Sequence, residues 1–166
     1  MIKTERLKFV PLSYEYLDQY YEEFTEDITR YQYPDSFKSR EDAEKFFNWF
    51  IKLNQERTSL IYILLDAEDE SFVGDVEAHG LDTDTPELGV WIAKRHQNKG
   101  YAYEAIKSFI EYLKTNYTIE SFIYEADCRN TASQRLAEKL GGIKGEHEDI
   151  VTESGKELQL DTYYIK

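Results

Sequence analysis

Cysteine is nearly absent from this 166-residue sequence: Cys128 is the only one, so no disulfide can form within the chain. A lone thiol is typical of a packed side chain in a reducing compartment. The sequence has other material for a core, since 41% of its residues are hydrophobic and 15% are aromatic. We therefore expect a cytoplasmic protein that folds as a single domain over residues 1–166.

Long apolar runs are also missing, and none approaches the length that spans a bilayer. The start of the chain alternates charged with apolar residues, unlike the basic-then-apolar order of a signal peptide. Basic residues are scarce, with 20 Lys and Arg against 33 Asp and Glu, for a net charge of −13. This balance argues against nucleic-acid and membrane partners and favours a cationic one. The sequence predicts no metal site and does not indicate an oligomeric state.

The charge is unevenly distributed along the chain. Residues 94–107 carry four basic side chains and one acidic one, whereas residues 71–93 carry five acidic side chains and no Lys or Arg. Solvated charges scatter over any surface, so these two windows alone do not define a site. Their adjacency nevertheless suggests neighbouring regions for an anion and a cation.

Hydrophobic periodicity predicts alternating strands and helices. Period-two alternation or short apolar runs indicate strands at residues 6–12, 59–65, 72–81, 87–93, 119–127, 143–152 and 157–165. Helical spacing and capping residues indicate helices at residues 14–24, about 40–53, 100–116 and about 130–140. These elements interleave irregularly, which predicts one mixed α/β domain.

The segment between the predicted strand 87–93 and the predicted helix 100–116 has the features of an anion site. Free backbone N–H groups and the positive end of the helix dipole converge where such a helix begins. Gly100 and Ala102 keep the backbone accessible, and Lys94, Arg95 and Lys99 add positive charge at the rim. The spacing is neither that of a P-loop nor that of a dinucleotide fingerprint. Phosphate is the natural occupant.

This segment, Gln97-Asn98-Lys99-Gly100-Tyr101-Ala102, matches the pattern Arg/Gln-x-x-Gly-x-Gly/Ala of the GNAT acetyltransferase superfamily. The flanking sequences extend the resemblance over nearly the whole chain and resemble the RimJ/RimL branch: Thr4-Glu5-Arg6-Leu7, Glu87-Leu88-Gly89-Val90-Trp91-Ile92, Gly100-Tyr101-Ala102-Tyr103-Glu104-Ala105, Asn130-Thr131-Ala132-Ser133 and Glu138-Lys139-Leu140-Gly141.

The resemblance implies a GNAT-like mixed α+β fold, with a mostly antiparallel, splayed sheet of about seven strands and about four flanking helices. It also implies acetyl-CoA as cosubstrate and direct acetyl transfer, in a ternary complex, to a primary amine of a protein N-terminus or a small cationic molecule. The pyrophosphate would lie on the backbone of residues 97–102, the pantetheine arm along residues 91–94, and the thiol near Asn130 and Ser133. The implied cofactor-binding residues are Trp91, Ile92, Ala93, Lys94, Gln97, Asn98, Lys99, Gly100, Tyr101, Ala102, Asn130 and Ser133.

Acetyl transfer requires a neutral amine, so a base or a water relay must take a proton from the ammonium. Related enzymes often use the counterpart of Glu87 for this step, although Glu87 can equally be a rim carboxylate that attracts a cation. Asp75, Glu77 and His79 share one face of the preceding predicted strand and are alternatives, with a structural hydrogen bond the simpler role for His79. The developing oxyanion would be held by a backbone N–H near Ile92.

The departing thiolate needs a proton or a hydrogen bond. Many GNAT enzymes use a tyrosine for this, but this chain has Ala137 at that position. The resemblance to the RimJ/RimL branch assigns the role to Ser133. The alternative is a structural role, in which the Ser133 hydroxyl bonds to the backbone at the start of a helix. Gly142 is a second departure, because relatives usually have an aromatic residue there. We expect this glycine to loosen the core or open the cleft.

Two other functions remain alternatives. A non-catalytic acyl-CoA-binding sensor or interaction module of the same fold would bind CoA without releasing free thiol in the presence of an amine. A nucleotide-binding protein would be stabilised by ATP at least as well as by CoA. Acceptor specificity is expected to lie in residues 14–53, which include Tyr31, Tyr33, Phe37 and Trp49, and in the closing hairpin.

Overall fold

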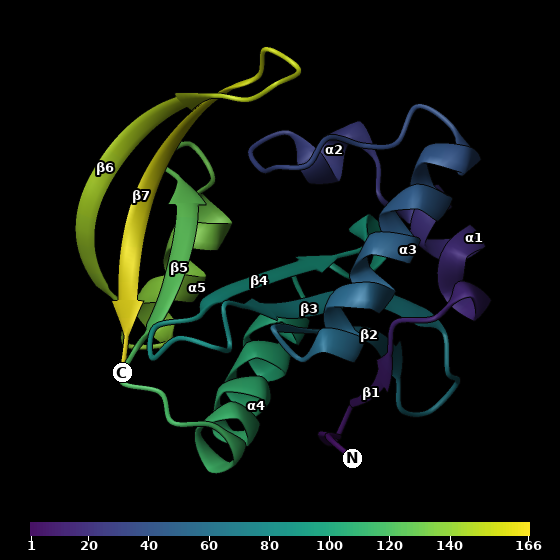
Figure 1. Ribbon diagram of the computed structural model, residues 1–166, viewed down its shortest axis with the longest axis horizontal. Coiled ribbons are helices and arrows are strands. Elements are labelled where there is room, and N and C mark those ends of the chain that lie inside the picture. The colour runs from purple at the N-terminus through teal and green to yellow at the C-terminus, as the bar shows by residue number, and fades with distance from the viewer.

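The computed structural model describes residues 1–166 and contains one seven-stranded sheet with the strand order β1-β2-β3-β4-β5-β7-β6 (Figure 1). The strands are β1 (Leu7–Pro11), β2 (Ser59–Asp66), β3 (Phe72–His79), β4 (Glu87–Ile92), β5 (Phe122–Asp127), β6 (Ile143–Val151) and β7 (Glu157–Ile165). The predicted mixed α+β fold is confirmed.

Neighbouring strands are antiparallel except at the centre, where β4 and β5 run parallel. This central pair is very short, with only Glu87 opposite Ile123 and Leu88 opposite Tyr124. Beyond Leu88 the two strands diverge, and the sheet opens into the V seen between β4 and β5 in Figure 1. From Gly89 onward the edge of β4 that faces β5 is therefore unpaired.

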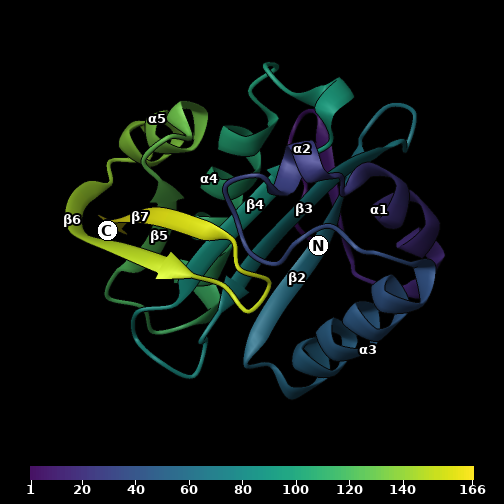
Figure 2. The same cartoon turned by 90° about the horizontal axis from the view of Figure 1, so that it is seen from above.

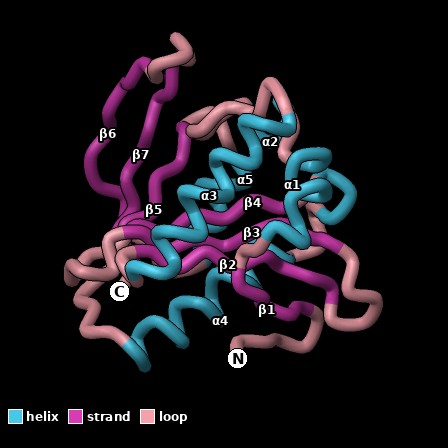
Figure 3. Tube along the Cα trace, turned by 45° about the vertical axis from the view of Figure 1, so that its right-hand side comes forward, coloured by secondary structure: helices cyan, strands magenta, loops and turns pink.

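Helices cover both faces of the sheet. Helices α1 (Leu17–Glu23) and α3 (Arg40–Glu56) lie on one face of β2 and β3, and α4 (Tyr101–Asn116) lies on the other (Figures 2 and 3). Helix α5 (Thr131–Lys139) packs against β5. Two separate hydrophobic clusters result, one centred on α4 and the other on α1 and α3. None of the helices combines the length and apolar character needed to cross a bilayer.

The predicted helix 14–24 is divided, because a 3₁₀ turn (Tyr14–Tyr16) precedes α1. The structure also contains a short helix that was not predicted, α2 (Glu26–Thr29), whose first turn is capped by the side chain of Thr25. Strand β5 begins at Phe122, three residues later than predicted, because the backbone N–H of Glu120 bonds to Asp84 O in a loop contact. A second 3₁₀ turn (Lys94–His96) precedes the predicted anion loop.

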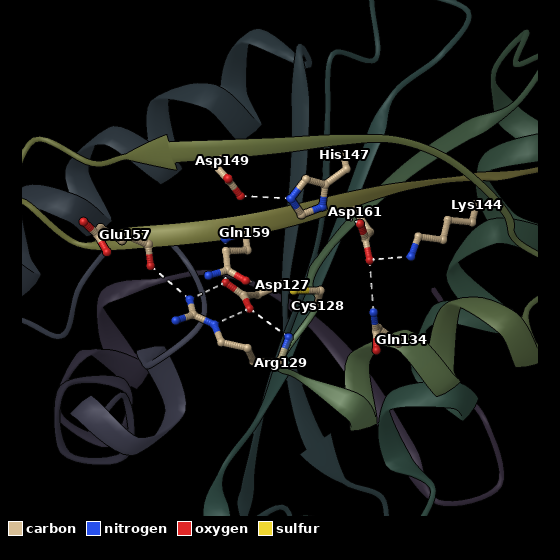
Figure 4. Close-up of polar contacts among 10 residues, drawn as sticks. All are labelled: Asp127, Cys128, Arg129, Gln134, Lys144, His147, Asp149, Glu157, Gln159 and Asp161. Carbon is tan, nitrogen blue, oxygen red and sulfur yellow. Dashed lines mark hydrogen bonds and ion pairs between the residues drawn. The ribbon is translucent and has the colours of Figure 1, made fainter.

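Two buried carboxylates hold the C-terminal strands together (Figure 4). Asp161 on β7 receives hydrogen bonds from Lys144 Nζ at 2.8 Å and His147 Nδ1 at 2.7 Å, both on the otherwise exposed strand β6. Asp127 at the end of β5 is bound by the Arg129 guanidinium at 2.7 and 2.8 Å. Burial raises the pKa of Asp127, but hydrogen bonds from Arg129 and the backbone outweigh it and bring the pKa to about 2. These ion pairs fix one wall of the V.

Candidate active site

A cavity of about 490 Å³ passes through the opening between β4 and β5. Its walls come from the end of β4, the loop before α4, the first turn of α4, β5, α5 and the segment that follows α1. The residues that line it include Asp27, Tyr31, Val90, Trp91, Ile92, His96, Gln97, Asn98, Gly100, Tyr101, Ala102, Tyr124, Asn130, Ser133 and Lys139. The cavity therefore joins the predicted anion loop to the splayed centre of the sheet.

The anion loop turns twice through left-handed backbone conformations, with φ of 60° at Asn98 and 80° at Gly100. Helix α4 begins directly afterwards, at Tyr101. The backbone N–H groups of residues 98–103 donate to no protein acceptor. Six free donors at the positive end of a 16-residue helix form a strong site for the oxygens of a phosphate or pyrophosphate.

Arg6 supports this loop from behind, a role that sequence reasoning missed. Its guanidinium donates to Lys99 O at 2.8 Å, forms an ion pair with Glu104 at 2.6 Å, and stacks over the Tyr101 ring at 4.5 Å. Partial burial raises the pKa of Glu104, but hydrogen bonds from Thr4 and Arg6 lower it by more, so this carboxylate stays ionised. Arg6 lies in the segment Thr4-Glu5-Arg6-Leu7, which matches the family. Its contacts could not be predicted, because they are made with residues far away in the sequence.

Nine of the twelve predicted cofactor residues line the cavity, and Ala93, Lys94 and Lys99 do not. Ala93 is fully buried, and Lys94 extends to Asp27 at 3.4 Å. Arg95, the other predicted rim cation, instead binds Glu23 at 3.0 Å and Phe72 O at 3.1 Å. Lys94 and Arg95 are thus engaged in ion pairs that hold the loop in place. The free N–H groups remain to attract an anion.

Gln97 and His96 contribute in ways that their sequence position does not show. Gln97 Nε2 donates to Ile92 O at 3.1 Å, so this side chain holds the loop against the end of β4. His96 lines the cavity, and both of its ring nitrogens are buried without a protein hydrogen-bond partner. Burial and the charges of Arg95 and Lys99 lower the pKa of His96. A neutral imidazole with unused hydrogen-bonding atoms therefore faces the anion loop.

At the other side of the cavity, Ser133 meets a residue that the sequence analysis did not single out. The Ser133 hydroxyl lies 2.7 Å from the Tyr124 hydroxyl, and Tyr124 is a buried residue of β5. The Ser133 N–H bonds to the Asn130 side chain, which caps α5. Burial raises the pKa of Tyr124, so its hydroxyl keeps its proton at neutral pH. Two hydroxyl groups therefore converge where the resemblance places the thiol.

The predicted proton acceptors lie on one face of β3 and β4. The register places Asp75 opposite Trp91, Glu77 opposite Gly89 and His79 opposite Glu87, and opposed residues share a face of the sheet. None of these four titratable residues lines the cavity itself, although Trp91 does. Desolvation, followed by the charge of Glu125, raises the pKa of Glu87, which is exposed at the start of β4.

Hydrogen bonds connect the groups on this face. Trp91 Nε1 donates to the Tyr20 hydroxyl at 3.2 Å, and that hydroxyl donates to Asp75 Oδ2 at 2.7 Å. Asp75 and Glu77 are neighbours on this face of β3, and Glu77 Oε2 lies 2.6 Å from His79 Nε2. His79 Nδ1 in turn lies 2.9 Å from the Ser59 hydroxyl.

The segment after α1 contributes to the cavity lining through Asp27, Ile28, Arg30, Tyr31 and Gln32. This segment lies beside the turn between β6 and β7 (Figures 1 and 2). Lys156 in this turn donates to Thr29 O at 2.8 Å and Gln32 O at 2.9 Å, and it forms an ion pair with Asp35. The Arg129 guanidinium stacks over the Tyr31 ring at 4.9 Å.

Of the aromatic residues that the sequence analysis named for specificity, Tyr31 lines the cavity, whereas Phe37 packs against the cluster around α1 and α3. Tyr33 and Trp49 are exposed. No group of three or more side chains is arranged to hold a metal ion.

Comparison with known proteins agrees with this geometry. The model of the acetyltransferase (GNAT) domain family matches residues 6–143. No curated protein sequence is similar enough to count as a relative. The chain belongs to the GNAT acetyltransferase family, which is a family of N-acetyltransferases.

Solved structures show the same fold. Spermidine N-acetyltransferase from Vibrio cholerae, in complex with CoA and spermine, is 20% identical with a TM-score of 0.82, covering 98% of this chain and 96% of that chain. RimL, the ribosomal L7/L12 α-N-protein acetyltransferase in complex with CoA, is 13% identical with a TM-score of 0.84, covering 97% and 94%. A GNAT-family acetyltransferase from Bacillus anthracis is 24% identical with a TM-score of 0.81, covering 98% and 95%. RimJ/RimL-like proteins are therefore among its structural relatives.

Proposed function

We propose that this protein transfers the acetyl group of acetyl-CoA directly to a primary amine, either of a small cationic molecule or of a protein N-terminus. One observation carries the proposal: five of the six residues with free N–H groups, all but Lys99, line a cavity that is also lined by Ser133 and Tyr124, whose hydroxyls are paired. Such a cavity suits a long ligand with a phosphate at one end and a reactive group at the other.

The anion loop and His96 would hold the pyrophosphate, and the unpaired edge of β4 would pair with the amides of the pantetheine arm. The bound thioester supplies the activated acetyl group. The backbone near Ile92 offers a fixed dipole for the negative charge that develops on the carbonyl oxygen. Ser133, whose hydroxyl contacts that of Tyr124, would donate a hydrogen bond to the departing sulfur.

The acceptor would approach from the opposite face, where acidic side chains predominate. Glu77, Glu87 and Glu125 lie on the neighbouring strands β3, β4 and β5, and Glu148 lies on β6, with β7 in between. Glu87 and Glu125 have no basic partner. This charge favours a cationic amine. The structural relatives include proteins named for acting on spermidine and on ribosomal L7/L12, and both types of acceptor carry an ammonium group. Glu87 and Glu77 are the candidates for taking its proton.

The test is an assay of free thiol release from acetyl-CoA by purified protein, with spermidine and with a serine-initiated basic peptide as acceptors. We expect amine-dependent release with at least one acceptor and retention of the acetyl group on its primary amine by mass spectrometry. CoA binding without thiol release across a wider amine panel would instead identify a non-catalytic CoA-binding module.

A thermal-shift comparison tests the ligand. CoA is expected to raise the melting temperature more than ATP at equal concentration, because only CoA carries an arm that can pair with β4. Equal stabilisation by ATP would contradict the assignment of the cavity to CoA.

A further inference from the structure

The groups that can accept a proton beside β4 differ in their access to an acceptor. Asp75 is fully buried, and its Oδ2 is already bound by the Tyr20 hydroxyl. Glu87 lies at the start of β4, where β4 is still paired with β5. Glu77 retains 20% of its side-chain exposure and stands opposite Gly89, the first residue of β4 beyond that pairing.

Gly89 leaves the space in front of Glu77 open. A Cβ built at Gly89 would lie 3.8 Å from Glu77 Oε2, so the carboxylate lies beside β4 at a position that has no side chain. Trp91, which lines the cavity, is the next residue on the same face of β4, about 7 Å further along the strand at about 3.3 Å per residue. Glu77 is therefore within reach of an amine at the cavity, either directly or through one water.

The neighbours of Glu77 also fix the orientation of its carboxylate. Asp75 Oδ1 is buried and has no hydrogen-bond partner, so Asp75 does not hold Glu77 through this atom. On the other side, His79 reaches from Glu77 to Ser59 and is partly exposed. Burial lowers the pKa of His79, so its ring is neutral near pH 7, with Nε2–H donating to Glu77 and Nδ1 accepting from Ser59.

We propose that Glu77 is the catalytic base of the proposed acetyl transfer, and that His79 is a positioning residue that orients it. Glu77 keeps 20% of its side chain exposed and returns the proton to solvent. The proposal rests on the proposed function. The ammonium of the acceptor gives one proton to the Glu77 carboxylate, the neutral amine forms the C–N bond as the C–S bond breaks, and the second amine proton leaves with the thiolate. Net, one ammonium and one thioester give one amide, one thiol and one proton in solvent.

The ionisation of Glu77 suits this task. Burial raises the pKa of Glu77 to about 7, with the charge of Glu87 adding to the rise and the hydrogen bond from Asp75 opposing it. The same face carries Tyr20 from α1, which stays protonated because burial raises its pKa, while α3 contributes the uncharged ring of Phe50 next to His79. Since only the ionised base accepts a proton, kcat should rise with pH through about 7.

Four variants test which residue is the catalytic base. Each is assayed with spermidine or the serine-initiated peptide, whichever is the better acceptor. Glu77→Gln should lower kcat at pH 7.5 by about 100-fold, the lower end for proton-transfer catalysis. The loss of kcat in Glu77→Gln relative to wild type should become smaller as the pH approaches the pKa of the amine, because the amine then loses its proton without a base. His79→Leu should move the acidic limb of the kcat–pH profile to higher pH, since the Glu77 carboxylate loses a hydrogen-bond donor. Glu87→Gln should move it to lower pH, since a like charge is removed.

Glu68→Gln, in the exposed turn between β2 and β3, is the matched control and should leave the profile unchanged. Unaltered CoA binding and melting temperature in Glu77→Gln would show that the variant folds. A wild-type pH profile in Glu77→Gln, or loss of the acidic limb in Glu87→Gln alone, overturns the proposal and leaves the acetyltransferase function standing. Absence of thiol release by the wild-type protein would instead refute the proposed function.

Discussion

The hydroxyls of Ser133 and Tyr124 form a pair in which each orients the other at 2.7 Å. Helix α5 holds Ser133 from one side through its Asn130 cap, and the core holds the Tyr124 ring from the other. Ala137, which occupies the position of the usual tyrosine, is completely buried and has no polar atom to offer. The two hydroxyls at this end of the cavity thus come from β5 and the start of α5.

Ser133→Ala is expected to lower kcat by about tenfold, below the range of full proton-transfer catalysis because a CoA thiol is already a fair leaving group. Tyr124→Phe should lower it about fivefold, which corresponds to one hydrogen bond of about 1 kcal/mol. Steady-state kinetics measure both effects.

Tyr163→Phe is the matched control, since Tyr163 lies opposite Tyr124 in the register and its hydroxyl has no hydrogen-bond partner. Equal losses in Tyr124→Phe and Tyr163→Phe would indicate general damage to the core rather than a role for the hydroxyl pair.

Individual residues show where the sequence was informative. The anion loop was predicted because its signal is local: a strand, a glycine and a helix in succession. Tyr124 and Arg6 were missed because their roles depend on contacts across the sheet. Gly142 was expected to loosen the core or open the cleft, but the structure is closely packed there. A Cβ at this position would lie 2.7 Å from Ala137 O and 3.3 Å from Tyr163 Cβ.

At the scale of elements, the start of α4 is positioned by a residue that precedes β1. Arg6 connects the loop carbonyl of Lys99, the Glu104 carboxylate in the first turn of α4, and the Tyr101 ring. Tyr101 is further tied to Asp66, at the end of β2, by a hydrogen bond of 3.0 Å. The free N–H groups are therefore pre-organised before any ligand binds, which lowers the entropic cost of binding.

Arg6→Gln should raise the Kd for CoA by about tenfold, or about 1.4 kcal/mol. The melting temperature should change little, because Arg6 is 42% exposed and exposed ion pairs contribute about 0–1 kcal/mol. Isothermal titration with CoA measures the affinity. Lys8→Gln is the control, because it removes the Lys8–Glu70 ion pair, which does not contact the loop. This variant should bind CoA as the wild-type protein does. Unchanged affinity in Arg6→Gln would show that the loop keeps its shape without this support.

All seven strands were predicted with nearly correct bounds, because alternation with period two marks a strand with one buried face. Helix α2 was not predicted, since four residues are too few to show a helical period. The resemblance implied a splayed sheet, but the parallel pairing of β4 with β5 was not predicted. Alternation does not specify a strand's partner or the length over which two strands pair.

At the scale of the whole molecule, the cavity is closed by a contact between segments more than 120 residues apart. Lys156 in the β6–β7 turn binds the carbonyls of Thr29, the last residue of α2, and of Gln32, which follows it. These charge-assisted bonds join the two halves of the molecule above the splay, on the side from which the acceptor would enter. The sequence indicated this region for specificity but not which contact defines it.

Lys156→Met is expected to raise the KM for the acceptor by about tenfold, a loss of about 1.4 kcal/mol, while kcat and the Kd for CoA change little. Acceptor titrations at saturating acetyl-CoA measure the effect. Lys52→Met, on the exposed face of α3, is the control. A change in CoA affinity without a change in acceptor KM would show that the contact serves the cofactor side of the cavity instead.

The two-residue pairing of β4 with β5 has a mechanical consequence. The sheet consists of a four-stranded part and a three-stranded part that share only two register pairs, so it is weakest along this line. A ligand that pairs with the free edge of β4 and also contacts α5 acts as a missing strand. Its binding would convert two loosely joined sheets into one continuous hydrogen-bonded body, and its departure would return the molecule to its more compliant form.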